Sequence, residues 1–277
     1  MTPTTHNDAA AADADAVTFD PTVPNAARMW NYWLGGKDNF PADRAAAEVV
    51  IAAFPVLPRI ARATRQFLGE AVQRLAAQYG VRQFLDIGAG LPTADNTHEV
   101  AQRVAPGSRV VYVDNDPVVL AQAKALVTST PEGKADFILA DLQDPETILT
   151  EAARTLDFSQ PVAVLLLAVL HFIAEDAHPD AIVARLLAAA PSGSYLVLAH
   201  AGSDIPSAEL DGAVRAYNER SPVKLVPRSR EQIDRLLAGL EPVGPGVVPL
   251  SQWFEPGHLD GDGLDHLGYY GIVRKPG

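Results

Sequence analysis

Short apolar strands alternate with helices through the middle of the sequence, and three of these strands lead into aspartates. Alternation of this kind predicts βαβ units and a largely parallel sheet. The carboxyl ends of parallel strands meet at one edge of the sheet, where ligands bind in open α/β folds. The strands and their aspartates are Gln83–Ile87 with Asp86, Arg109–Val113 with Asp114, and Asp136–Ala140 with Asp141. The sequence therefore predicts an α/β fold with a ligand site formed by these carboxylates.

The remaining predicted elements complete one α/β domain with helices on both faces of the sheet. Further strands are predicted at Val162–Leu167, Tyr195–Ala199, Val247–Phe254 and Tyr269–Val273. Helices are predicted at Ala26–Leu34, Ala42–Ala53, Arg59–Gln78, Thr97–Val104, Pro117–Leu126, Pro145–Arg154, Asp180–Ala189, Ser207–Glu219 and Ser229–Leu237. We expect the last two strands to pair as a terminal hairpin at the sheet edge.

Length and hydropathy indicate how the chain is organised. The chain has 277 residues, 48% of them hydrophobic, which is enough for one large core. We interpret residues 1–20 as a disordered tail, residues 21–80 as an N-terminal helical cap, and residues 81–277 as the main domain, compact with the cap. The tail lacks the features of a signal peptide, and the longest apolar run, residues 161–170, is too short to span a bilayer. We therefore expect a cytoplasmic protein that does not bind a membrane.

Charge and cysteine content exclude several functions. The formal net charge is −12, which argues against nucleic-acid binding because neutralising phosphates needs clustered Lys and Arg. The absence of cysteine excludes disulfides, thiolate zinc sites and a cysteine nucleophile. One cluster has metal-ligating side chains, namely His258, Asp260, Asp262, Asp265 and His266. It lacks the later ligands of a calcium loop, so we predict a solvated loop and no metal.

The glycines after the first strand indicate a nucleotide-like ligand. They stand in the order Asp86-Ile87-Gly88-Ala89-Gly90, and glycine permits positive φ and close approach of the backbone to a ligand. Asp114 ends the second strand, where an acidic side chain can accept hydrogen bonds from both ribose hydroxyls. Asp141 ends the third strand, where it could meet an adenine amino group.

The neighbours of the glycines indicate the charge of that ligand. A dinucleotide fingerprint has a third glycine, but Leu91-Pro92-Thr93 follows Gly90. Asp86 also places negative charge beside the glycines, which disfavours a pyrophosphate and favours a ligand with a cationic or zwitterionic end. S-adenosylmethionine (SAM) carries an ammonium and a sulfonium and meets this condition. A nicotinamide-dependent oxidoreductase on the same fold is an alternative, as is a protein that binds SAM without turnover.

The same motifs, together with an N-terminal string, resemble a known family. The chain after its first 20 residues is similar to a bacterial S-adenosyl methyltransferase family within the class I SAM-dependent methyltransferases. The resemblance is carried by Pro24-Asn25-Ala26-Ala27-Arg28, by Tyr32-Trp33-Leu34-Gly35-Gly36-Lys37-Asp38-Asn39-Phe40, and by residues 84–93 and 111–117. It implies a Rossmann-like sheet of seven strands, six parallel and one antiparallel, and an enzyme that uses SAM as its cofactor.

The resemblance also implies which residues surround the cofactor. They are Asp86, Gly88 and Gly90 in the glycine loop, Asp114 at the ribose, Asn115, Asp141 and Leu142 at the adenine, and Ala168 at the end of the fourth strand. Cofactor and acceptor pockets meet at that last position.

The N-terminal string is a candidate lid over the cofactor. Glycine and polar residues fill positions 35–39, and functional residues favour such loops. We expect Tyr32, Lys37 and Asn39 to contact the cofactor, with Lys37 or Arg28 pairing with its carboxylate. Packing against the edge of the sheet is the alternative for this string.

His171 is the candidate general base. It follows the fourth strand, where a base could stand if the acceptor has a proton to lose; packing or helix capping is its alternative role. The acidic balance and the cap favour a small-molecule acceptor over nucleic acid. The pattern specifies neither that acceptor nor an oligomeric state.

Overall fold

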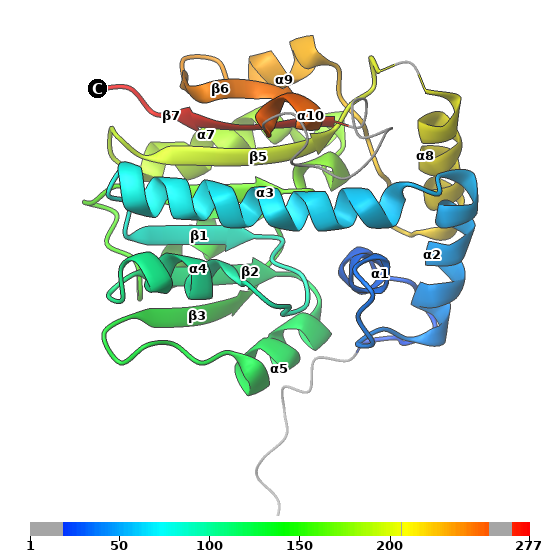
Figure 1. The fold of residues 1–277 in the computed structure, drawn as a ribbon, viewed down its shortest axis with the longest axis horizontal. Helices are drawn as coiled ribbons and strands as arrows, with labels where there is room; N and C mark the ends of the chain where they lie inside the picture. Colours follow the sequence, from blue (N-terminus) through cyan, green and yellow to red (C-terminus); the bar gives the residue numbers. More distant parts are fainter. Residues whose placement is uncertain (1–18, 206, 255–267) are drawn as a thin grey trace, which may run out of the picture.

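Seven strands form one sheet in the order β3-β2-β1-β4-β5-β7-β6 (Figure 1). The computed structural model describes residues 19–205, 207–254 and 268–277. The strands are β1 (Gln83–Ile87), β2 (Arg109–Asp114), β3 (Lys134–Leu139), β4 (Ala163–Leu167), β5 (Tyr195–Ala201), β6 (Glu241–Pro249) and β7 (Gly268–Arg274). The neighbouring strands β3, β2, β1, β4 and β5 are parallel to one another. The strand β7 is antiparallel to both β5 and β6. One strand therefore runs against the other six, which confirms the predicted sheet.

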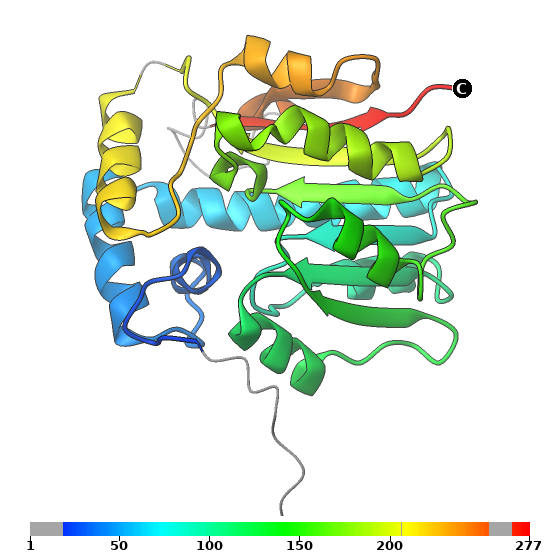
Figure 2. The same cartoon turned by 180° about the vertical axis from the view of Figure 1, so that it is seen from behind.

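Helices cover both faces of this sheet. One face carries α3 (Leu57–Gln78) and α4 (Thr97–Val104), and the opposite face, seen in Figure 2, carries α6 (Pro145–Ala152), α7 (Pro179–Ala189) and α9 (Arg230–Leu236). The helix α5 (Pro117–Leu126) packs beside β2 and β3. None of the helices that the described residues form is long and apolar enough to cross a membrane.

Alternate side chains of the central strands enter two different cores. On β1, Leu85 and Ile87 pack with α6 and α7, whereas Phe84 packs with α3 and α4. This follows from the two-residue period of a strand. Asp86 points to the same face as Phe84 by that period, and it is buried although it is charged. Asp86 is thus the one charged residue of β1, next to its carboxyl end.

A third core lies beyond the carboxyl ends of the strands. It joins α1 (Ala26–Trp33), α2 (Pro41–Ala53), the beginning of α3 and α8 (Ala208–Arg220). Asn25 begins α1, and its side-chain oxygen accepts a hydrogen bond from the Ala27 amide at 2.7 Å, which satisfies an otherwise unpaired donor. Figure 1 shows α1, α2 and α8 together past the strand ends. The cap thus includes a helix from the C-terminal half of the chain.

The predicted strand Val247–Phe254 is wrong in its second half. The strand β6 ends at Pro249, and Leu250–Trp253 forms the short helix α10. Leu250 and Trp253 are three positions apart, so one helical turn buries both against the core of α3. The strand also begins earlier than expected, at Glu241. Because β6 is an edge strand, it tolerates prolines and glycines that read as a turn in the sequence.

Candidate functional site

A cavity of about 610 Å³ lies between the cap and the carboxyl ends of β1, β2 and β4. The residues predicted at the strand ends all line it: Asp86, Gly88, Gly90, Asp114, Asn115, Asp141, Leu142, Ala168 and His171. The volume is within the range of small-molecule and cofactor sites, roughly 300–1,000 Å³. The structure therefore brings together residues that are up to 85 positions apart, from Asp86 to His171.

The glycine loop after β1 has the backbone shape that only glycine adopts at low cost. Gly88 has φ +74° and Gly90 has φ +66°, both in the left-handed region. The amide N–H groups of Gly88 and Ala89 both donate to the carbonyl oxygen of Val113, at 2.8 and 3.1 Å. A Cβ on Gly88 would come within 2.5 Å of a Val169 methyl group, whereas a Cβ on Gly90 would meet nothing within 4 Å. Gly88 is required for close packing, and Gly90 leaves space open beside the loop.

Asp114 ties the glycine loop to the end of β2. Its two carboxylate oxygens accept hydrogen bonds from the amides of Gly90, at 2.9 Å, and Asp116, at 3.0 Å. Burial raises the pKa of Asp114 to about 6, although these backbone donors oppose the shift. Each oxygen still has a lone pair, so the carboxylate can accept further hydrogen bonds from a ligand.

Asp86 is a deeply buried carboxylate of the cavity. Its Oδ2 accepts a hydrogen bond from Thr97 Oγ1 at 2.6 Å, and its side chain is nearly inaccessible. Burial raises the pKa of Asp86, while the Thr97 hydroxyl and the positive charge of Arg65 lower it. Arg65, on α3, also lines the cavity. Nothing in the sequence marks Arg65 as a site residue, because it lies in a helix whose other residues belong largely to the core.

The ends of β2 and β3 are joined by their polar side chains. Asn115 Nδ2 donates to Asp141 Oδ2 at 2.9 Å, and the Gln143 amide donates to Asp141 Oδ1 at 2.8 Å. Leu142 is buried beside them and lines the cavity. These contacts hold a polar rim next to an apolar surface, which is the pattern a flat base such as adenine requires.

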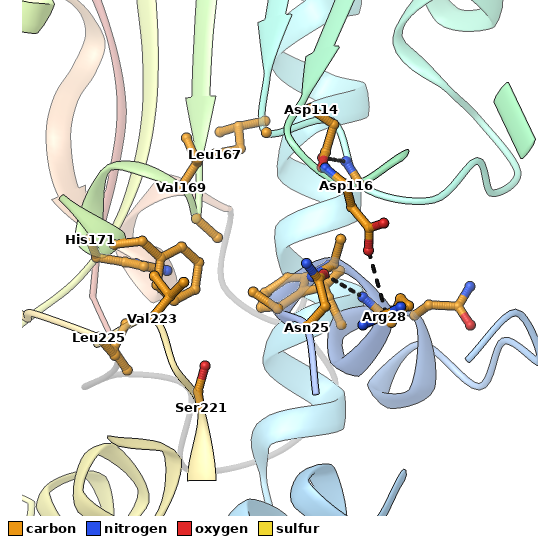
Figure 3. Close-up of a pocket in the computed structure, with 18 of the residues that line it drawn as sticks. Asn25, Arg28, Asp114, Asp116, Leu167, Val169, His171, Ser221, Val223 and Leu225 are labelled. Atoms are coloured by element: carbon orange, nitrogen blue, oxygen red, sulfur yellow. Dashed lines mark hydrogen bonds and ion pairs between the residues drawn. The ribbon is translucent and has the colours of Figure 1, made fainter. Parts of the chain in front are cut away.

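The chain leaves β4 through a strained residue. Ala168 has φ +57°, and a non-glycine residue pays roughly 1–2 kcal/mol in the left-handed region. Its amide donates to the Ala199 carbonyl of β5 at 2.9 Å. Strain of this kind gathers at functional sites, and here it turns the chain so that Val169 and His171 reach the cavity (Figure 3).

His171 is held neutral. Burial lowers its pKa well below 6.5, and the nearby His200 and Arg228 lower it further. Its Nδ1 lies 3.5 Å from the Ala201 amide, which donates to it. A neutral imidazole has one lone pair, and here Nδ1 directs it at the Ala201 amide, so His171 can take a proton from an acceptor by giving up this long contact.

Arg228 is a buried cation behind His171. It is 1% exposed, and its guanidinium donates to the carbonyl oxygens of Leu170 at 3.1 Å and Ile173 at 2.6 Å. These carbonyls flank the turn that carries His171. Arg228 also donates to Nε2 of His200 at 2.9 Å. His200 is therefore neutral, and burial, aided by Arg228, lowers its pKa to about 4.

Three predicted cofactor contacts in the N-terminal string do not line the cavity. Tyr32 donates its hydroxyl to Glu48, and Lys37 is exposed. Asn39 donates to Asn31 Oδ1 at 2.8 Å and to the Gly36 carbonyl oxygen at 3.0 Å. These side chains fix the turn between α1 and α2 instead. Other residues of the string line the cavity instead, namely Pro24, Asn25, Ala26, Ala27, Arg28, Trp30, Asn31, Trp33 and Leu34.

Arg28 connects the cap to the main sheet. Its Nε lies 3.3 Å from Asp43 of α2 and 3.5 Å from Asp116 at the beginning of α5. Its Nη2 donates to the Val23 carbonyl at 2.8 Å, whereas Nε and Nη1 are buried without a hydrogen-bond partner. Figure 3 shows Arg28 next to Asp116, on the side of the cavity where Asp114 lies. Because Nε lies in ion pairs with both aspartates, Nη1 is the donor that suits a ligand with acceptor oxygens.

The described residues contain no group of three or more side chains that could hold a metal ion. The predicted solvated loop with His258, Asp260, Asp262, Asp265 and His266 lies outside the described residues. The expectation of no metal there stays a prediction.

The sheet and the cavity define a class of protein. Six strands with one reversed neighbour, a glycine loop after β1, and aspartates after β2 and β3 are the features of a Rossmann-like class I methyltransferase. The chain belongs to the S-adenosyl methyltransferase family, which it matches over residues 12–276. The predicted enzyme class, a SAM-dependent methyltransferase with SAM as its cofactor, is thereby confirmed.

Solved structures agree with this assignment. A DUF574 family protein from Streptomyces avermitilis is 41% identical, with a TM-score of 0.89 over 93% of this chain and 99% of that chain. A candidate methyltransferase from Thermobifida fusca is 39% identical, with a TM-score of 0.84 over 92% and 96%. The plantazolicin methyltransferase, at 13% identity and a TM-score of 0.50 over 90% and 95%, shares the fold. No curated protein matches the sequence significantly.

The residues of the cavity fit SAM. The buried carboxylates of Asp86 and Asp114 suit a ligand with cationic groups and ribose hydroxyls. The Nη1 donor of Arg28 suits an acceptor oxygen, and the open space at Gly90 admits a ligand close to the backbone. We therefore assign this cavity as the candidate cofactor site.

Proposed function

We propose that the protein transfers the methyl group of SAM to a small-molecule acceptor that enters the same cavity. The observation that supports this most is the extent of the cavity. It reaches from Asp114 at the end of β2 to His171 after β4, beneath the cap, with a total volume of about 610 Å³. An acceptor beside the cofactor must fit within such a space, which favours a compact molecule over a folded macromolecule.

The residues at the ends of β1, β2 and β3 would hold the cofactor. The Asp114 carboxylate would accept hydrogen bonds from the ribose hydroxyls, and Asn115 with Asp141 would contact the adenine edge. Asp86 would face the ammonium end. Arg65 lies beside Asp86 on the cavity wall, and it is a better candidate than the exposed Lys37 for the cofactor carboxylate.

The chain's own part in the reaction would be orientation and removal of a proton. When bound, SAM supplies a methyl carbon made electrophilic by a positively charged sulfur. The cap and the strand ends would align an acceptor atom with that carbon and exclude water, and alignment of this kind accounts for much of an enzyme's rate. Neutral His171 would accept the proton of an acceptor that carries one.

Ligand-dependent thermal stability tests the cofactor site. A ligand at about 100 times its dissociation constant stabilises a protein by roughly 2.7 kcal/mol. We expect SAM and S-adenosylhomocysteine (SAH) to raise the Tm of the wild type and NAD to leave it unchanged. Stabilisation by NAD alone would contradict the assignment and favour an oxidoreductase.

Transfer itself is tested with methyl-labelled SAM. The protein is incubated with a metabolite extract, with RNA or with protein from a bacterial lysate, and the label is followed into each fraction. We expect label in the small-molecule fraction, reduced by His171→Gln if the acceptor has a proton to lose. Label in RNA or protein only would contradict the proposed acceptor class. SAM binding without any labelled product would favour a non-catalytic SAM-binding protein.

A further inference from the structure

The charged side chains of the cavity all come from one part of the chain. Those contributed by the described residues are Asp20, Arg28, Arg65, Asp86, Asp114, Asp116 and Asp141. Among the described residues after Asp141, the lining includes no aspartate, glutamate, lysine or arginine. Figure 3 shows the division, with Asp114, Asp116 and Arg28 on one side and His171, Val223 and Leu225 on the other. We call the second side the uncharged wall; it consists of the lining residues from Leu167 onward.

The helix α8 and the segment after it contribute apolar residues to the uncharged wall. From α8 come Leu210, Ala213, Val214 and Tyr217, and from the following segment come Val223 and Leu225. The one hydroxyl pair among them is internally satisfied, because Ser221 Oγ donates to the Tyr217 hydroxyl at 3.2 Å. This surface therefore offers contact area rather than ion pairing.

The titratable groups of the uncharged wall carry no charge at neutral pH. His171 and His200 are both buried in it, and the buried guanidinium of Arg228, 2.9 Å from His200 Nε2, opposes a second positive charge there. The Arg228 guanidinium is itself used by carbonyls and by Glu175. An ionised ligand against this wall would lose its hydration without gaining a partner, which is costly.

One apolar residue of this wall, Val223, is also open to solvent. Val223 is 46% exposed, yet its side chain lines the cavity. A large apolar residue in such a position contacts both the solvent and any molecule that passes into the chamber. An exposed apolar residue that leads to an apolar wall favours entry of a molecule that gains by leaving water.

We infer that the acceptor is an uncharged, mainly apolar molecule that binds against the uncharged wall of α8 and residues 221–225. This inference rests on the proposed function, since it names the class of acceptor for the same site. The charged side of the cavity is then left to the cofactor. The nucleophilic atom of the acceptor would lie near His171, which faces the cavity beside Val169 in Figure 3.

Matched pairs of probes test the inference on the full chain. Each pair has a neutral and a carboxylated member of similar size: phenol and benzoate, 2-naphthol and 2-naphthoate, and 1-decanol and decanoate. Binding is measured by calorimetry at neutral pH with saturating SAH. We expect at least one neutral member to bind about tenfold or more tightly than its carboxylate, because burying an unpaired charge costs several kcal/mol.

Two exposed valines provide a matched pair of variants. Val223→Asp puts a charge at the rim of the uncharged wall, and Val104→Asp puts the same charge on α4, where Val104 is 37% exposed and does not line the cavity. We expect Val223→Asp to weaken binding of the neutral probe about tenfold or more, and Val104→Asp to leave it unchanged. Val223→Leu should retain it. SAH affinity should be the same in all three variants.

Three results would overturn the inference. The first is that no neutral probe binds more tightly than its carboxylate. The second is that Val223→Asp binds the neutral probe as well as the wild type does. The third is that Val223→Asp loses SAH affinity, which would assign this wall to the cofactor. A wild-type protein that does not bind SAH would contradict the proposed function itself. This failure is distinguished from the other three because SAH binding is measured without any probe.

Discussion

The two sides of the cavity are built from the same sheet and differ in charge. The charged side lies at the ends of β1, β2 and β3, where Asp86, Asp114 and Asp141 face the cavity with their hydrogen bonds in place. The uncharged wall lies at β4 and β5 and on α8, where the titratable groups are the neutral His171 and His200.

The difference shows how one fold serves two ligands. A cofactor with fixed charges and hydroxyls is recognised by carboxylates tied to backbone amides, so this side is polar and rigid. Part of the uncharged wall is supplied by α8, which packs on α1 and α2 beyond the strand ends. Its side chains can change without disturbing the glycine loop, so the acceptor can differ between proteins that use the same cofactor.

The largest expected effect is a loss of stability when Arg228, which supports the uncharged wall, is replaced. Arg228→Ala would leave the carbonyl of Ile173 and Nε2 of His200 without their donor and would remove one of the two donors to the Leu170 carbonyl. Breaking a buried charged network costs about 3–5 kcal/mol, and we expect urea unfolding to show a loss of this size. The matched control is Arg235→Ala, whose exposed ion pair with Glu231 should contribute less than about 1 kcal/mol. Equal losses in both variants would show that Arg228 is not the support of this wall.

The next largest expected effect is a loss of cofactor affinity when Asp114 on the charged side is replaced. Asp114→Ala removes the acceptor of the Gly90 and Asp116 amides and the proposed partner of the ribose hydroxyls. Hydrogen bonds to a charged group contribute about 1.5–3 kcal/mol, so we expect calorimetry to show a roughly 10- to 150-fold loss of SAH affinity. Asp144→Ala is the control, because Asp144 caps α6 and does not line the cavity. An unchanged affinity in Asp114→Ala would move the ribose site elsewhere.

Substitutions at two glycines between the two sides of the cavity distinguish the cost of a steric contact from the cost of a left-handed backbone. Gly88→Ala combines a left-handed φ with a Cβ 2.5 Å from Val169, a residue of the uncharged wall. Gly90→Ala has the φ penalty alone, since its Cβ would meet open space. We expect thermal unfolding to show losses of about 2–4 kcal/mol for the first and about 1 kcal/mol for the second. Equal losses would mean that the Val169 contact is relieved without cost.

The smallest effect is a pH dependence confined to the charged side. Asp114 has a pKa of about 6, and its ionised form is the better acceptor for ribose hydroxyls. We expect SAH affinity to fall about tenfold as the pH drops one unit below that pKa, because only a minor fraction then stays ionised. Asp114→Asn should flatten this profile. Binding of a neutral probe to the uncharged wall should not change over the same range.

The same pKa shift predicts the sign of a stability change. The native Asp114 carboxyl keeps its proton up to about pH 6, whereas the unfolded one releases it near its ordinary value of about 4. The native state therefore binds more protons between these values, and the ligand-free protein should lose stability as the pH rises across that window. Urea unfolding of the wild type and of Asp114→Asn checks this, and identical slopes would exclude Asp114 as the cause.

Much of the sheet and of the charged side could be predicted because the signals are local. The bounds of β1 agree with the prediction at both ends, as do those of α4 and α5. The residues at the ends of β1, β2 and β3 line one cavity as predicted, because carboxyl ends of parallel strands share an edge whatever surrounds them. An apolar strand followed by Asp or Gly can be recognised from the sequence alone, without knowing which strands lie beside it in the sheet.

The sequence by itself determined the fold class, the family and the charged side of the cavity. The tertiary structure decided which face of the N-terminal string turns inward, so that Arg28 lines the cavity and Tyr32, Lys37 and Asn39 do not. It also decided that Arg65 of α3 and the side chains of α8 take part. These outcomes depend on how helices far apart in the chain pack against one another, and packing of that kind leaves no local period or motif in the sequence.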